Sequence, residues 1–182
     1  MPKYKKIGFS NNNAKIDEIV QQYQDSCLAI RFYFSLQNPK AYELFVGFSE
    51  SELLEQCNKV LQENELALSL VLLSALEANF RVDYISRVER KLRDDLSRYF
   101  RDLYKNNGNR VSLEDDILEG WKSHTNIHQQ LIGNIKSAFK YRHWLAHGRY
   151  WQPKLGQEYD FFKLQSLCES SLEQFNFYIN NE

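Results

Sequence analysis

The segment from Arg142 to Trp151 gathers the residue types of this chain that best suit chemistry on a phosphodiester. Its ten residues, Arg-His-Trp-Leu-Ala-His-Gly-Arg-Tyr-Trp, include two histidines, two arginines and three aromatic residues. Histidine exchanges protons near neutral pH, and the planar fork of arginine matches phosphate oxygens. Tyr150 and Trp151 could stack on a base. The composition of this segment therefore favours chemistry on RNA.

The spacing between Arg142 and His147 limits where this pair can act. Residues five apart on a straight helix point about 140° apart, so the two side chains converge only near a helix end or across a partner chain. Gly148 is well suited to end a helix there. His143 and His147 are four apart and share one face. The alternative interpretation is aromatic packing at a helix C-terminus, where histidine and arginine interact favourably with the helix dipole.

Two charged residues interrupt otherwise apolar helical stripes. Glu77 stands in the stripe at positions 66, 70, 73, 77, 80 and 84, and Arg142 stands in the stripe at 131, 135, 138, 142 and 145. A lone buried charge is costly, so it requires a partner, a hydrated cleft or a function. The opposite signs predict that Glu77 and Arg142 approach each other. A purely structural ion pair, or stripes that turn toward solvent, would explain the pattern equally well.

Glu77 has further charged neighbours in its own segment. Arg81 follows it by four residues, in the order that favours an ion pair on a helix, and Asp83 lies close by. We expect Arg81 and Asp83 to support the site or to contact RNA. A solvated pair on the helix surface is the alternative for each of them.

No residue pattern indicates a metal or cofactor site. His124 and His128 have the four-residue spacing of metal ligands, but no third histidine or nearby cysteine completes a site, so surface histidines are the simpler interpretation. Cys27, Cys57 and Cys168 are odd in number and far apart, which argues against disulfides and zinc. Walker, Gly-x-Gly-x-x-Gly and Gly-x-Ser-x-Gly motifs are absent, so nucleotide-binding and hydrolase functions based on them gain no support.

Scarce turn residues favour long helices as the elements that position these groups. The chain has 182 residues with only 7 Gly and 3 Pro, and 43% of its residues are hydrophobic. We predict a single all-α bundle of five to seven helices over residues 14–182, after a flexible lead-in over residues 1–13. The predicted helices cover residues 14–37, 64–92, 94–105, 113–123, 126–147 and 161–179, and a capping box of Ser49 and Glu52 begins another.

Charge and hydropathy bear on where the protein acts. The formal net charge is −1, so any contact with RNA must come from a local basic patch. No long apolar run follows the first six residues, so no signal peptide is expected, and the longest apolar stretch, near residues 66–76, is too short to span a bilayer. We therefore expect a cytoplasmic protein with no membrane partner.

The same segment matches the pattern of a known family. An arginine, four to six residues and then a histidine near the end of a helix define the HEPN superfamily, and Arg142 and His147 fit that pattern. The longer strings over residues 75–84 and 138–151 resemble the RiboL-PSP-like branch of bacterial HEPN ribonucleases. The resemblance covers the chain from about residue 64 to its C-terminus.

The resemblance implies a helical bundle that dimerises, so that two Arg…His motifs meet in a shared cleft, and a metal-independent endoribonuclease activity. His147 would then transfer protons, Arg142 would orient or neutralise the scissile phosphate, and Glu77 would support them. Two positions depart from the family. His143 stands where the common variant has a polar residue such as Asn, and Arg149 stands where toxins paired with nucleotidyltransferases have a tyrosine.

The sequence thus predicts an endoribonuclease of a toxin–antitoxin or phage-defence system, with RNA as substrate and no cofactor. The predicted partners are a second copy, through the helix that carries Arg142 and His147, and an antitoxin protein. With Glu77 as the third catalytic residue, the expected supporting or RNA-binding residues are His143, Arg81, Asp83, Arg149, Tyr150 and Trp151. The alternative is a catalytically inactive HEPN-like dimer that binds a partner protein or RNA.

Overall fold

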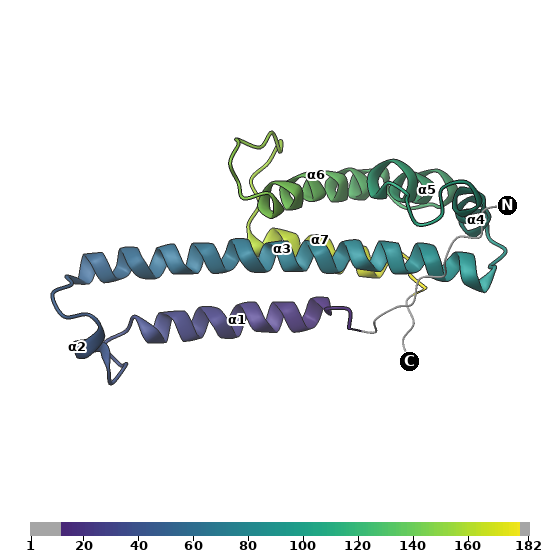
Figure 1. Cartoon of the computed structure of the whole chain (residues 1–182). Helices are drawn as coiled ribbons and strands as arrows, with labels where there is room; N and C mark the ends of the chain where they lie inside the picture. The colour runs from purple at the N-terminus through teal and green to yellow at the C-terminus, as the bar shows by residue number, and fades with distance from the viewer. Residues whose placement is uncertain (1–11, 179–182) are drawn as a thin grey trace.

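The computed structural model describes residues 12–178, which form α-helices and one π-helical turn but no strand (Figure 1). In chain order the elements are α1 (Ile16–Tyr33), α2 (Ala41–Leu44), α3 (Glu50–Arg90), α4 (Asp95–Asn107), η1 (Leu113–Ile117), α5 (Leu118–His124), α6 (Gln129–Ala146) and α7 (Phe161–Gln174). The predicted all-α class is confirmed, with seven α-helices in the described range. Of the predicted lead-in, residues 1–11 lie outside this range. No helix within it is long and apolar enough to cross a bilayer.

The longest element, α3, runs through the whole molecule and forms an antiparallel hairpin with α1. The predicted capping box is confirmed, since Ser49 N donates to Glu52 Oε2 at 2.8 Å and Glu52 N donates to Ser49 Oγ at 3.3 Å. The helix that begins there is 41 residues long and includes the segment predicted to start near residue 64. No Gly or Pro lies between Ser49 and Arg90, so nothing breaks the helix in between.

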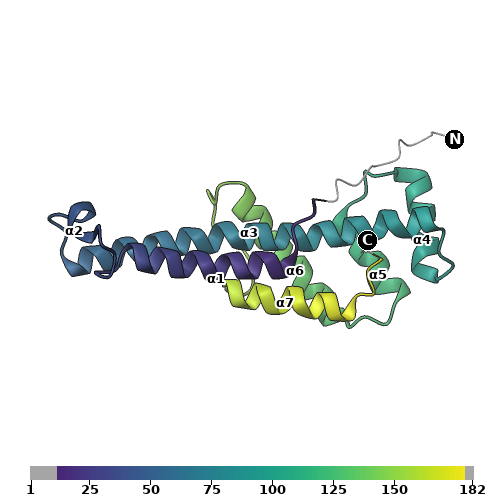
Figure 2. The same ribbon diagram turned by 90° about the horizontal axis from the view of Figure 1, so that it is seen from below.

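Four helices, α1, α3, α6 and α7, share one core along the C-terminal half of α3 (Figures 1 and 2). Phe80 of α3, Ile135 of α6 and Leu164 of α7 are fully buried in it. Burial of each such side chain contributes about 1.5–3 kcal/mol. The ring of Phe80 meets that of Phe175 edge-on, with centroids 4.9 Å apart. This core fixes the relative positions of α3 and α6, which carry the candidate site.

The end of α7 differs from the sequence-based prediction. The helix stops at Gln174, whereas the apolar pattern predicted that it continues to residue 179, which lies outside the described residues. Phe175 and Phe177 leave the helix and direct their rings at Phe80 and at each other, with Phe175 and Phe177 stacked at 5.5 Å. Burial of two aromatic rings outweighs the loss of one more helical turn.

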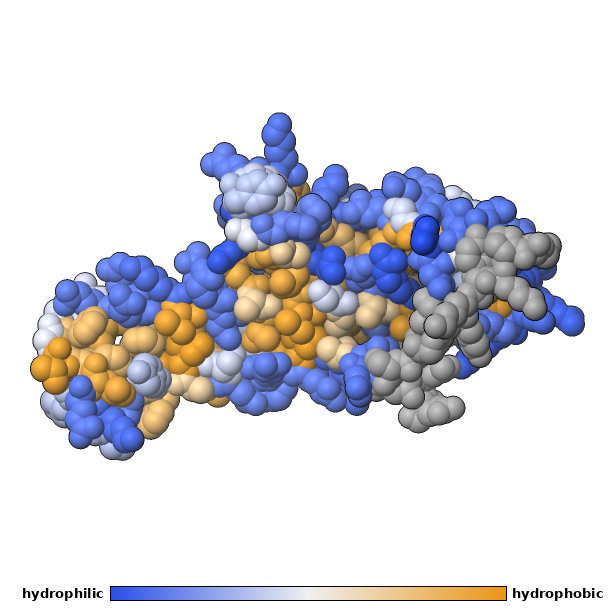
Figure 3. Space-filling view, in the orientation of Figure 1, coloured by the Kyte–Doolittle hydropathy of each residue, from blue (hydrophilic) through white to orange (hydrophobic). Residues whose placement is uncertain are grey.

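The core ends before the turn that joins α1 to α3. α7 begins at the level where Tyr23 stacks on Phe161 with centroids 3.8 Å apart, and where Phe161 N donates to Glu65 Oε1 at 3.1 Å. Beyond that level α1 and α3 continue without α6 or α7 and end in α2 (Figure 1). This projection, residues 28–62, is termed the arm. Figure 3 shows apolar side chains gathered on its outer end.

Candidate functional site

The two charges that interrupt the apolar stripes contact each other. Arg142 Nη1 on α6 lies 3.0 Å from Glu77 Oε2 on α3, and the two side chains are 31% and 14% exposed. The predicted approach of Glu77 and Arg142 is therefore confirmed. Because both groups are only partly exposed, solvent and salt screen their attraction less than that of a surface pair.

Two further groups on α3 hold this pair in place. Arg81 Nε donates to Glu77 Oε1 at 2.7 Å, and Arg142 Nε donates to Ser74 Oγ at 3.2 Å. The Ser74 hydroxyl in turn donates to the Leu70 carbonyl at 2.7 Å, which leaves its oxygen lone pairs for Arg142. Glu77 Oε2 is buried and accepts no well-aligned hydrogen bond, so its contact with Arg142 is Coulombic. Two guanidinium charges against one carboxylate leave the cluster with a net charge of +1.

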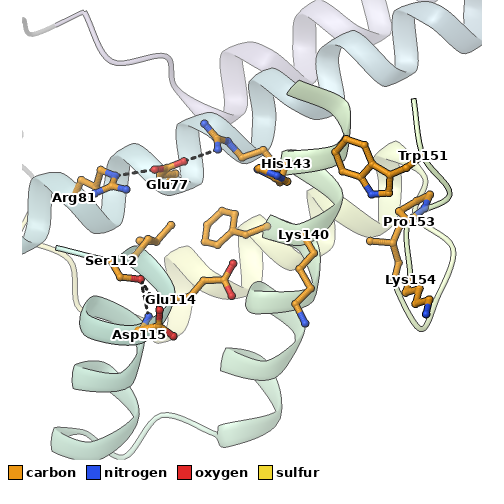
Figure 4. Close-up of a pocket in the computed structure, with 14 residues that line it drawn as sticks. Glu77, Arg81, Ser112, Glu114, Asp115, Lys140, His143, Trp151, Pro153 and Lys154 are labelled. Carbon is orange, nitrogen blue, oxygen red and sulfur yellow. Dashed lines mark hydrogen bonds and ion pairs between the residues drawn. The ribbon is translucent and has the colours of Figure 1, made fainter. Parts of the chain in front are cut away.

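The cluster forms one wall of a pocket of about 650 Å³ between α3, α6, η1 and the loop that follows α6 (Figure 4). This volume suits a small ligand or a single nucleotide. Four cations and three carboxylates line it: Arg81, Lys140, Arg142, Lys154, Glu77, Glu114 and Asp115. Cations can bind a phosphate, and carboxylates can accept hydrogen bonds from the amino groups of a base.

The acidic wall of the pocket comes from a π-helical turn. Ser112 precedes η1, and its Oγ accepts a hydrogen bond from Asp115 N at 3.1 Å. The sequence predicts one helix over residues 113–123, but the first five of these residues form a π-helix before α5 begins. Figure 4 shows Glu114 and Asp115 on this turn, facing the cluster on α3 across the pocket.

Two imidazoles lie together at the end of α6, but only one of them lines the pocket. The helix ends at Ala146, His147 is its C-cap, and the rings of His143 and His147 are 4.2 Å apart between centroids. Gly148 follows with φ +79°, a conformation that glycine adopts without strain, so the predicted helix end is confirmed. His143 lines the pocket beside Arg142, whereas the exposed His147 stands outside the lining.

The loop after α6 closes one side of the pocket. Trp144 Nε1 donates to the Trp151 carbonyl at 2.7 Å, and Ser137 Oγ donates to the Leu155 carbonyl at 3.0 Å. These bonds tie the loop to α6 at two points. The Trp151 ring lines the pocket with its centroid 5.9 Å from that of His143. An aromatic face is thereby held next to the imidazole and the guanidinium.

Arg149 and Tyr150 lie outside the pocket lining. Arg149 Nη1 and Nη2 donate to the two carboxylate oxygens of Glu63 at 3.0 and 2.8 Å, which anchors the start of the loop to α3. These bonds hold the pKa of Glu63 below its ordinary value. Tyr150 is 84% exposed and packs edge-on against Trp151, with centroids 4.6 Å apart.

The structure places Asp83 in the core and not at the site. Its side chain is fully buried, and it accepts hydrogen bonds from Arg87 Nε at 2.8 and 2.9 Å and from Tyr178 N at 2.7 Å. Burial raises the pKa of Asp83 to about 6, against the opposing effect of the Arg87 guanidinium. A carboxylate without solvent exposure cannot contact RNA, so its role is structural.

Sequence reasoning did not single out several pocket residues. Nothing in the sequence distinguishes Lys140 and Lys154 from surface lysines. Glu114 and Asp115 are acidic residues of the kind that favour the first turn of a helix. Lys140 precedes Arg142 by two residues, which is the only local signal that could have pointed to it. The other three reach the pocket through η1 and the loop after α6, whose course no local pattern reveals.

The histidine pair weighed as a metal site is divided between two helices. His124 ends α5 and stacks on Tyr99 with centroids 4.7 Å apart, whereas His128 is the N-cap of α6. Their four-residue spacing therefore does not place them on one helix face. Within residues 12–178 no three His, Cys, Asp or Glu side chains are grouped so that they could hold a metal ion.

The site thus combines a fixed guanidinium, two neighbouring imidazoles and an aromatic ring at the edge of a pocket. These groups can bind a phosphate, move protons and stack a base. No family model, curated protein or solved structure matches the chain. The geometry and chemistry of the pocket are therefore the basis for assigning a function.

Proposed function

We propose that this protein is a metal-independent endoribonuclease of the HEPN type, acting as a toxin or a phage-defence effector. The observation that carries the proposal is the guanidinium of Arg142, held by Glu77 beside His143 in the pocket wall. A cation fixed before the substrate arrives stabilises developing charge without reorganising during the reaction. RNA is the proposed substrate because Trp151 offers a face for a base and the pocket lysines offer charges for backbone phosphates.

The proposed reaction is a transphosphorylation that needs two proton transfers. One imidazole takes the proton of the ribose 2′-OH as the 2′-oxygen attacks the adjacent phosphorus. The bond between O2′ and phosphorus forms, the bond to O5′ breaks, and the other imidazole protonates the leaving O5′. The products are a 2′,3′-cyclic phosphate and a 5′-hydroxyl. His147 is the proposed base. His143 is the proposed acid, since its ring centroid lies 4.2 Å from that of His147. Arg142 neutralises the phosphate oxygens.

The alternative function is a catalytically inactive HEPN-like dimer that binds a partner protein or RNA. One observation favours it, namely that the Glu77 carboxylate lies 3.0 Å from Arg142 Nη1 and offsets part of the positive charge that a phosphate would need. In either case we propose that the protein acts as a homodimer. In the toxin case an antitoxin protein would be the further partner.

The experiment that tests the function is RNA cleavage in EDTA by the purified full-length chain. We expect single-stranded or structured RNA to be cut to products that carry a 2′,3′-cyclic phosphate, identified by mass spectrometry. His147→Ala and His143→Ala should each lower the rate by about 100-fold or more. His124→Ala, which removes an exposed histidine at the end of α5, serves as the matched control and should cut normally.

Each other outcome has a defined meaning. Undiminished cleavage by His147→Ala would remove His147 from the mechanism. Activity that EDTA abolishes and added metal restores would overturn the metal-independent reaction. Binding of RNA without cleavage, with all variants folded by circular dichroism, would establish the inactive dimer instead.

A further inference from the structure

The arm exposes an unusual concentration of large apolar side chains. Of the fifteen large hydrophobic residues that are exposed in residues 12–178, ten belong to the arm. Six of these are more than half exposed: Leu28 68%, Phe32 53%, Leu36 69%, Tyr42 82%, Val46 78% and Leu54 63%. Figure 3 shows apolar side chains gathered at the end of the molecule that carries α2.

The apolar area of the arm is large enough for a specific interface. If each of the six side chains offers roughly 150–200 Å² when fully exposed, together they leave on the order of 700 Å² in contact with water. The largest apolar patch of a typical monomer is about 300–600 Å², and a stable dimer buries about 800 Å² on each partner. An interface that covered all six side chains would therefore approach the area that one partner of a stable dimer buries.

The fold explains why this surface is unpartnered. Along the core, α1 and α3 are completed by α6 and α7, but the arm consists of the same two helices without those two additions (Figure 1). A small aromatic cluster closes only its inner side, where Phe34 and Phe45 stack with centroids 5.4 Å apart. Two helices cannot enclose a core by themselves, whereas four can. Two further helices, packed against the arm, would therefore complete a four-helix arrangement.

The charge of the arm favours a protein partner over an anionic one. Residues 28–62 contain three basic and four acidic residues, which gives a net charge of −1. Binding to anionic lipid or to nucleic acid requires a basic surface, which the arm does not have. A net charge this small produces little repulsion between two copies of the arm.

We propose that a second copy of this chain docks on the arm, with the two arms antiparallel, so that two pairs of α1 and α3 complete a four-helix bundle. This assigns a contact surface to the homodimer, and it rests on the arm itself, not on the ribonuclease activity. The rise of α3 from Glu50 to Glu63 is about 20 Å. Arms that overlap along this length would bring α2 of one copy beside Glu63 and Arg149 of the other, at the end of α6 where His147 is exposed.

The first test is the oligomeric state of the full chain by sedimentation velocity across the micromolar range. We expect a dimer, and the double variant Phe32→Glu with Leu54→Glu should raise its dissociation constant at least about 100-fold. Both side chains are exposed, so the helical circular dichroism signal should not change. Leu172→Glu, at an exposed apolar position of α7 outside the arm, is the matched control and should remain dimeric.

The second test addresses the antiparallel orientation. A chain with Val46→Cys at the turn and a chain with Gln62→Cys at the base of the arm are mixed and oxidised. We expect a disulfide-linked heterodimer in excess over the linked Val46→Cys homodimer. An excess of the Val46→Cys homodimer would overturn the antiparallel arrangement.

Three results would overturn the docking proposal altogether. They are a monomer at every concentration, a dimer that the double variant leaves intact, and flotation with neutral phosphatidylcholine vesicles that the double variant abolishes. None of these measurements uses RNA cleavage. A dimer without ribonuclease activity would therefore refute the proposed function and leave the arm interface standing.

Discussion

Two carboxylates of α3 pair with arginines of similar chemistry in very different surroundings: Asp83 with Arg87 of the same helix, and Glu77 with Arg142 of α6. Asp83 and Arg87 lie 2.8 Å apart with side chains 0% and 5% exposed, whereas Glu77 and Arg142 lie 3.0 Å apart with side chains 14% and 31% exposed. Arg87 also donates to the Asn176 carbonyl at 2.7 Å, and its guanidinium lies over the rings of two aromatic residues. Glu77 keeps one buried oxygen without a hydrogen bond, and the pair opens on a pocket.

The contrast separates a structural pair from a pair that a ligand can use. Asp83 and Arg87 are themselves both enclosed, so this pair fixes the C-terminal segment against α3 and offers nothing to a substrate. At the pocket, the Arg142 side chain is 31% exposed, so a phosphate oxygen can reach the same guanidinium that Glu77 holds. Burial and completeness of hydrogen bonding distinguish the two roles, although the residue types are alike.

The largest expected effect concerns the enclosed pair. Arg87→Ala leaves the Asp83 carboxylate buried and unpaired, so we expect the free energy of unfolding to fall by about 3–5 kcal/mol. Denaturant titration followed by circular dichroism measures it. The control is Arg98→Ala, whose exposed pair with Asp95 at 3.6 Å should be worth less than about 0.5 kcal/mol. Equal losses of stability from Arg87→Ala and Arg98→Ala would contradict the structural role of the enclosed Asp83–Arg87 pair.

The next effect concerns the open pair and falls on activity. Arg142→Ala should lower the rate of RNA cleavage by about 100–1000-fold, as the loss of a charge-stabilising donor does, while unfolding becomes easier by only about 1 kcal/mol. Arg142→Lys keeps the charge but not the fork and should recover part of the rate. A destabilisation as large as that of Arg87→Ala would mean that both pairs serve the fold.

The third effect is the contribution of Asp83 to the dependence of stability on pH. Its pKa in the folded protein is about 6, above its ordinary value of 3.8, so the folded state binds this proton more tightly than the unfolded state does. The resulting stability is present below about pH 4 and is lost as pH rises through 6, by on the order of 2–3 kcal/mol.

Asp83→Asn isolates this contribution, because the other carboxyl groups are common to both proteins. We expect the stability of Asp83→Asn relative to the original protein to increase between pH 4 and pH 6, as measured by denaturant titration at each pH. The opposite slope would show that the attraction of Arg87 outweighs burial in setting the protonation of Asp83.

The smallest effect is expected for Arg81, the exposed member of the open cluster. Its side chain is 44% exposed, so Arg81→Ala should cost only about 0.3–0.5 kcal/mol of stability, the size of a helix-surface pair. Cleavage should change by no more than about threefold if Glu77 and Ser74 keep Arg142 in place without Arg81. A loss of activity close to that of Arg142→Ala would make Arg81 a phosphate ligand in its own right.

Local patterns in the sequence were sufficient for the open pair but not for the enclosed one. Two apolar stripes, each broken by a charge of opposite sign, predicted the contact between Glu77 and Arg142 because each stripe marks a face turned toward the same core. Asp83 offered no such signal. Its burial depends on Tyr178 and Asn176, which lie far along the chain and reach α3 only because Phe175 leaves the last helix.

The pocket illustrates the same limit. Its guanidinium, one imidazole and Trp151 come from one short segment and were predictable, whereas its acidic wall depends on a π-helical turn that no periodicity announces. The unbroken length of α3 was also missed, since polar residues near its N-terminus obscured the continuity that the absence of Gly and Pro allows.

The uneven cover of α3 has a consequence for how the molecule opens. Leu72 and Phe80 are fully buried, so we expect amide protons near them to exchange with solvent only when the whole domain unfolds, and those of the arm to exchange through local fraying. Glu63 lies at the boundary between the arm and the core-covered part of α3. It accepts hydrogen bonds from Arg149 at the start of the loop that carries Trp151. Fraying that reached Glu63 would break this anchor, so we expect a partner bound to the arm also to steady the loop beside the pocket.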